Sequence, residues 1–80
     1  MTNQTKPEIR IIESWTGGYT VEIGRKTHPG QDAPWVPETY KDYNGLKEAE
    51  EVAKLNAEAY GLDYIGCYDR FEHPVYRNVQ

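Results

Sequence analysis

The sequence predicts an α+β fold, a small antiparallel sheet of three or four strands with one amphipathic helix packed on one face. Two segments with a period of two flank a Gly-Gly pair, which predicts a β-hairpin. Further along, apolar residues recur at helical spacing, and a last strand-like segment follows them. The predicted order of elements is therefore β-β-(β)-α-β.

The hairpin is predicted from residues 8–14 and 19–27, which read EIRIIES and YTVEIGRKT. Ile9 and Ile11 share one side of the first strand, as expected for a strand with one buried face. Residues 15–18, WTGG, supply the turn, because paired glycines tolerate the positive φ angles of a tight hairpin.

A third strand over 38–43, ETYKDY, is one of two interpretations, and the other is a simple approach to the helix. Pro37 suits the first residue of an edge strand, where no ladder donor is needed. The preceding stretch, HPGQDAPWVPETY over 28–40, holds three prolines, a glycine and Trp35. Prolines restrict the unfolded chain, which favours either a structural strap or a preorganised binding loop.

The helix is predicted over 46–60, LKEAEEVAKLNAEAY. Asn44 is its expected N-cap, and Gly61 suits the left-handed position after its end, with Leu62 packing back on the last turn. The expected apolar side comprises Leu46, Ala49, Val52, Ala53, Leu55, Ala59 and Tyr60, with Ala57 at its margin. The expected charged side comprises Lys47, Glu48, Glu50, Glu51, Lys54 and Glu58.

The last strand is predicted over 62–71, with Ile65 and Cys67 facing the helix and Tyr64 and Tyr68 facing away. One helix covers one face of such a sheet, so the other face stays open. Its expected residues are Arg10, Ile12, Thr20, Glu22, Lys26, Tyr64, Tyr68 and Arg70. This face is either a binding surface or homodimer interface, or it is closed by the 28–37 loop with Trp35 as a plug.

Size and charge limit the class of protein. Eighty residues form one domain, 1–80, whose polar segment 1–7 is expected to be flexible and which has little room for a buried cofactor. The formal charge is −4, which opposes a phosphate-binding footprint. A single cysteine, no leader-like segment and no long apolar run predict a cytoplasmic protein without an intramolecular disulfide or a membrane span.

No residues form a recognisable catalytic or metal-binding pattern. His28, Cys67, Asp69 and His73 match no zinc spacing, and the neighbours of Cys67 offer no activating base. The helix glutamates are expected to form a solvated face, since acid–base catalysis needs a cleft that perturbs their pKa values. We therefore expect no enzyme activity, no cofactor and no metal site.

The hairpin GGYTVEIGRK, the helix NGLKEAEEVAKLNAEAYGL and the closing strand DYIGCYD form a layout that resembles small phage-encoded inhibitors of host defence, including anti-CRISPR proteins. The resemblance implies stoichiometric binding to a protein or ribonucleoprotein complex of a host, by a monomer or homodimer. The candidate partner-binding residues are Trp35, Tyr40, Glu48, Glu50, Glu51, Glu58, Tyr64 and Tyr68. The alternative is a small nucleic-acid-binding module that stacks bases on Tyr64 and Tyr68.

Overall fold

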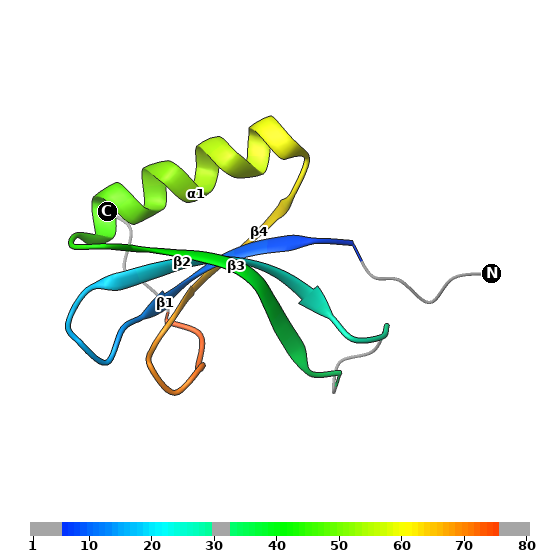
Figure 1. Ribbon diagram of the computed structural model, residues 1–80, viewed down its shortest axis with the longest axis horizontal. Helices are drawn as coiled ribbons and strands as arrows, with labels where there is room; N and C mark the ends of the chain where they lie inside the picture. Colours follow the sequence, from blue (N-terminus) through cyan, green and yellow to red (C-terminus); the bar gives the residue numbers. More distant parts are fainter. Residues whose placement is uncertain (1–5, 30–32, 76–80) are drawn as a thin grey trace.

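The computed structural model describes residues 6–29 and 33–75, in which four strands and one helix form two layers (Figure 1). The elements are β1 (Glu8–Glu13), β2 (Tyr19–Lys26), β3 (Trp35–Tyr43), α1 (Leu46–Tyr60) and β4 (Asp63–Tyr68). The strands lie in the order β3-β2-β1-β4, and α1 packs on one face of the sheet. The predicted α+β class is confirmed.

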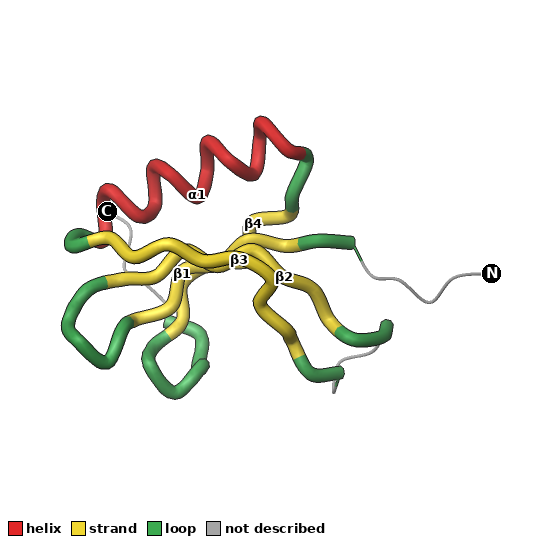
Figure 2. The backbone as a smooth tube through the Cα atoms, viewed as in Figure 1, coloured by secondary structure: helices red, strands yellow, loops and turns green. Residues whose placement is uncertain are grey.

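The sheet is mixed rather than wholly antiparallel. β2 pairs with β1 and β3 in antiparallel fashion, whereas β4 pairs with β1 in parallel. The reason is that each of the connections β1–β2, β2–β3, β3–α1 and α1–β4 reverses the chain, so β4 runs in the same direction as β1 (Figure 2). The helix therefore serves as the crossover that a parallel pair requires.

The turn of the β1–β2 hairpin has the glycine geometry that the sequence predicts. Gly17 has a φ of 104°, and the Ser14 amide donates to the Gly18 carbonyl at 2.8 Å. Both features close the two strands into a short antiparallel ladder.

The third strand exists, and it begins three residues earlier than predicted, at Trp35. A bulge shifts the β2–β3 register between Ile23 and Gly24, so that Gly24 faces Pro37. A side chain at Gly24 would place its Cβ 2.2 Å from the Val36 carbonyl oxygen. The glycine therefore allows β3 to extend along β2 as far as the loop.

The helix has the predicted bounds, but its first cap differs from the prediction. Gly45 occupies the N-cap position and makes no side-chain hydrogen bond, so the expected Asn44 cap is wrong. The predicted C-terminal cap is confirmed: Gly61 is left-handed, with a φ of 66°, and the Leu62 amide donates to the Ala57 carbonyl at 2.9 Å.

The hydrophobic core lies between α1 and the centre of the sheet. Its buried residues are Ile9, Ile11, Val21, Ala49 and Ala53, and the side chains partly buried against them are Tyr19, Ile23, Tyr43, Leu46, Ala57, Leu62, Tyr64 and Cys67. The predicted helix face is wrong at Leu55, which is exposed, whereas Ala57, predicted at its margin, packs inward. Leu55 is about two and a half turns from Leu46, so it points the opposite way. Ala59 and Tyr60 are exposed too.

The predicted orientation of Tyr64 is wrong because β4 contains a bulge. Ile9 faces Tyr64 and Ile11 faces Cys67, so β4 inserts an extra residue at Gly66, whose φ is 105°. Tyr64 and Cys67 thus both pack toward α1. Ile65, predicted to face the helix, is not among the described side chains that pack on the core.

Candidate functional site

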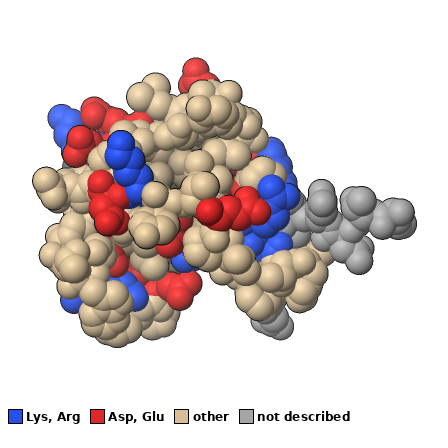
Figure 3. Space-filling model, in the orientation of Figure 1, with Lys and Arg blue, Asp and Glu red and all other residues tan. Residues whose placement is uncertain are grey.

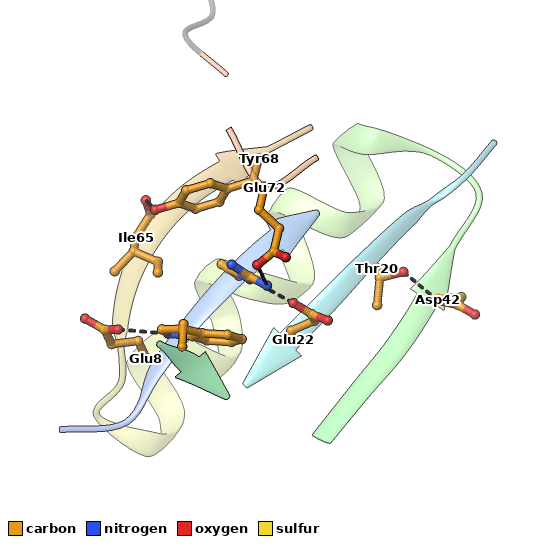
Figure 4. Close-up of polar contacts among 9 residues, drawn as sticks. Glu8, Thr20, Glu22, Asp42, Ile65, Tyr68 and Glu72 are labelled. Atoms are coloured by element: carbon orange, nitrogen blue, oxygen red, sulfur yellow. Dashed lines mark hydrogen bonds and ion pairs between the residues drawn. The ribbon is translucent and has the colours of Figure 1, made fainter. Parts of the chain in front are cut away.

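The open face of the sheet is organised around Arg10. Its side chain is only 7% exposed, and its Nε donates to Oε1 of Glu22 at 2.7 Å. One terminal nitrogen, Nη2, donates to Oε1 of Glu72 at 3.2 Å. Figure 4 looks onto this face with α1 behind the strands and shows Glu22, Glu72 and Tyr68 on it. The buried cation therefore has a carboxylate partner on each of two chain segments.

Aromatic rings enclose the same guanidinium. The Cζ atom of Arg10 lies 4.0 Å from the Trp35 ring centroid and 5.4 Å from that of Tyr68. The Trp35 indole N–H donates to Oε1 of Glu8 at 2.9 Å. The distances from the guanidinium to the two ring centroids are within the range of cation–π attraction. We call Glu8, Arg10, Glu22, Trp35, Tyr68 and Glu72 the Arg10 cluster.

The position of Trp35 decides between the two interpretations of the open face, as a binding surface or as a face closed by Trp35. It is half-buried on the open face, opposite Lys26, and it closes this side of the sheet from β3 itself. Tyr68 lies on the same face, as predicted, but its ring packs near Arg10. With Tyr64 on the helix side, the tyrosine platform that the nucleic-acid alternative requires does not form.

A second cluster lies where two turns meet at one end of the sheet. Trp15, in the β1–β2 turn, and Phe71, after β4, pack edge to face with centroids 5.2 Å apart and ring planes at 86°. Trp15 is 68% exposed and Phe71 is 63% exposed. Arg70 lies 5.3 Å from the Trp15 ring, and its Nε is 3.5 Å from Oε1 of Glu13. We call Glu13, Trp15, Arg70 and Phe71 the aromatic tip.

The turn that follows β4 holds Phe71 in place. Oδ1 of Asp69 accepts the backbone N–H groups of Phe71 at 2.8 Å and His73 at 2.9 Å. The hydrogen bond from His73, and next that from Phe71, hold the pKa of the Asp69 carboxyl below its usual value despite desolvation, and the charges of His73 and Arg70 add to this. Glu72 adopts a φ of 67°, which is uncommon for a residue other than glycine.

The sequence did not single out Trp15, Arg70 and Phe71 as a site. The sequence pattern places Trp15 only in a turn and Phe71 only at the end of the last strand. A large aromatic residue inside a short hairpin turn was the available signal, since such a turn has little core to bury it. The contact between Trp15 and Phe71, by contrast, depends on β4 lying beside β1.

The predicted partner-binding residues are distributed over four parts of the molecule. Trp35 and Tyr68 belong to the Arg10 cluster, and Tyr64 packs beneath the helix. Tyr40 is 71% exposed on β3. The helix glutamates project from α1, where Glu48, Glu51 and Glu58 are exposed and Glu50 is half-buried. The structure therefore does not bring the eight residues together.

A cavity of about 250 Å³ lies next to the aromatic tip and shares Glu13 with it. It is lined by Glu13, Tyr19, Leu46, Cys67, Tyr68, Asp69 and Val75. Among the described residues that line the cavity there is no histidine, lysine or arginine of the kind that activates cysteine. We therefore do not assign a nucleophile to this cavity.

Over the described ranges, no three His, Cys, Asp or Glu side chains are grouped so as to hold a metal ion. Within the same part of the chain, no helix has the length and apolar character needed to cross a membrane. Comparison with known proteins finds no matching family model, no matching characterised protein and no matching solved structure.

Proposed function

We propose that this protein is a non-enzymatic inhibitor that binds a larger host complex, such as a CRISPR–Cas complex or another nuclease defence system. The aromatic tip is the observation that carries this proposal. Trp15 and Phe71 are mostly exposed and held against each other by the chain's own geometry. Exposed aromatic clusters on small proteins are typical of surfaces that bind other proteins.

The energy available at the tip is sufficient for a binding anchor. Trp and Phe side chains each bury about 150 to 250 Å² when covered, which at about 25 cal/mol per Å² corresponds to several kcal/mol for the pair. Trp and Arg are enriched among the residues that dominate binding energy in protein interfaces. The Trp15–Phe71 contact also fixes both rings beforehand, which reduces the entropy lost on binding.

A protein surface is favoured over nucleic acid as the target of this tip. Arg70, the cation of the tip, lies within 3.5 Å of the Glu13 carboxylate, which offsets its charge. On the face in view in Figure 3, most Lys and Arg side chains lie beside Asp and Glu, and the one larger basic group, at the right edge, adjoins acidic side chains. Nucleic-acid affinity depends mainly on clustered positive charge, so the nucleic-acid alternative has little support here.

The test is inhibition of purified CRISPR effector complexes in a DNA-cleavage assay with increasing amounts of this protein. We expect stoichiometric loss of cleavage and a loss of potency of about 30-fold or more in the Trp15→Ala/Phe71→Ala double variant. Tyr60→Ala is the matched control, because it also removes an exposed aromatic ring, at the end of α1 and outside the aromatic tip.

Equal potency of the double variant and Tyr60→Ala would remove the tip from the proposal. Failure to inhibit any effector, combined with oligonucleotide binding that weakens steeply as salt rises, would favour the nucleic-acid alternative instead.

A further inference from the structure

The outer edge of β3 carries backbone groups that no other described strand uses. In an antiparallel pair, alternate residues direct their N–H and C=O groups toward the partner and away from it. The hydrogen bond from the Ser14 amide to the Gly18 carbonyl shows that even-numbered residues of β2 direct their backbone N–H and C=O groups toward β1. The hydrogen bond from the Thr27 amide to the Pro34 carbonyl shows that odd-numbered residues of β2 direct these backbone groups toward β3.

This alternation fixes which residues of β3 face outward. Val21 is opposite Lys41 and Ile23 is opposite Thr39, so those two residues bond to β2. Tyr40 and Asp42, which lie opposite even-numbered residues, therefore direct their N–H and C=O groups away from the sheet.

The edge is also open to a partner. β3 is the terminal strand of the sheet, and its residues from Val36 to Asp42 are all exposed. Pro37 has no N–H group, and the bulge lies beside it, so regular pairing is confined to residues 39–43. An unpaired strand edge of this kind is a template for another strand unless its side chains prevent pairing.

The side chains disfavour pairing with a second copy in registers centred on residues 40 to 42. In a two-fold antiparallel pair centred on Lys41, the two lysines would face each other, and one centred on Asp42 would do the same with two carboxylates. A pair centred on Tyr40 would place Asp42 opposite Glu38. Like charges directly opposite each other destabilise a strand pair, so each of these self-pairing registers is disfavoured.

We propose that the β3 edge accepts an extended antiparallel strand from a partner protein of complementary charge. Asp42 is held on the open face by the Thr20 hydroxyl, which donates to its Oδ1 at 2.7 Å. Lys41 projects on the other face, 5.7 Å from the Tyr43 ring centroid. The partner strand therefore carries a basic residue opposite Asp42, an acidic residue opposite Lys41 and a β-branched or aromatic residue opposite Tyr40. This surface is separate from the aromatic tip.

The test uses the full chain labelled with ¹⁵N and two short synthetic peptides. The complementary peptide places lysine opposite Asp42, glutamate opposite Lys41 and isoleucine opposite Tyr40, and the swapped peptide exchanges its lysine and glutamate. We expect the complementary peptide to bind about tenfold more tightly, with the amide signals of Tyr40 and Asp42 shifting most. The Lys41→Glu/Asp42→Lys variant should reverse this preference.

Tyr40→Pro is the backbone test, because it removes an outward N–H without breaking the ladder to β2. It should abolish peptide binding, whereas Trp15→Ala should leave it unchanged. The proposal is overturned if neither peptide shifts the Tyr40 and Asp42 amides, or if those amides respond only to increasing protein concentration, which would indicate self-pairing. Peptide binding that shifts only the amide signals of Trp15 and Phe71 would overturn the proposal for the β3 edge and would support the aromatic tip as the binding surface.

Discussion

The Arg10 cluster and the aromatic tip use the same residue types in opposite ways. In the Arg10 cluster the arginine side chain is 7% exposed and its Cζ lies 4.0 Å from the Trp35 ring centroid. In the aromatic tip Arg70 is 34% exposed and lies 5.3 Å from the Trp15 ring centroid. An arginine paired with a tryptophan therefore stabilises the fold at one place and remains available at the other.

Position in the sheet explains the difference. Arg10 lies on β1, which has β2 on one side and β4 on the other, so neighbouring strands supply partners from both directions. Trp15 and Arg70 lie in turns at the end of the sheet, where solvent replaces those neighbours. The chemistry of a residue set is thus insufficient to assign a role, and the enclosing strands decide it.

Removing the cation should separate the two regions most strongly. Arg10→Ala would leave Glu22, a mostly buried carboxylate, without its partner, and we expect a loss of about 3 to 5 kcal/mol in the free energy of unfolding. Arg70→Ala should cost about 1 kcal/mol or less, because its 3.5 Å ion pair with Glu13 is partly open to solvent. Urea denaturation of both variants measures the difference, and similar losses would contradict the contrast.

The two tryptophans offer the next largest contrast. Trp35→Ala removes a ring that packs on Arg10 and donates to Glu8, so we expect it to lower the free energy of unfolding by about 2 to 3 kcal/mol. Trp15→Ala should cost about 1 kcal/mol or less while reducing inhibition in the cleavage assay. Thermal denaturation gives the first comparison, and a more destabilising Trp15→Ala would reverse the assigned roles.

Local chemistry made the hairpin and the helix predictable from the sequence. Gly17 and Gly61 occupy positions with positive φ, and these are the positions where the sequence predicts a turn and a helix end. Residues 1–5, most of the segment expected to be flexible, lie outside the described residues.

The site was less predictable because it depends on contacts between distant segments. The predicted alternation of side chains along β4 is wrong because of the bulge at Gly66, where one extra residue reverses which side chains face the helix. The Arg10 cluster requires Glu72, and the aromatic tip requires Phe71, and both reach their partners only because β4 is parallel to β1. No periodicity in the sequence encodes those pairings.

The bulge itself can be tested at Gly66, with a smaller expected effect. Its φ of 105° is unfavourable for a residue with a Cβ atom, so Gly66→Ala should destabilise the fold by about 1 to 2 kcal/mol. Nothing surrounds the position at which a Cβ would lie, so backbone conformation alone causes the loss. The control is D-alanine at the same position, because a D residue adopts positive φ without the penalty that an L residue incurs. Equal losses in urea denaturation would argue against the bulge.

The smallest expected effect concerns pH and should be confined to the turn that follows β4. Because hydrogen bonds from His73 and Phe71 lower the pKa of Asp69 in the folded state, its stabilising contribution is complete above the usual carboxyl pKa and is lost as pH falls through the lowered value. Amide signals of Phe71 and His73 should follow this titration by NMR, while that of the buried Ile11 should not. In Asp69→Asn the carbonyl still accepts but no longer titrates, so both signals should become insensitive to pH in this range. A midpoint at or above the usual carboxyl pKa would show that the turn does not hold the carboxylate as described.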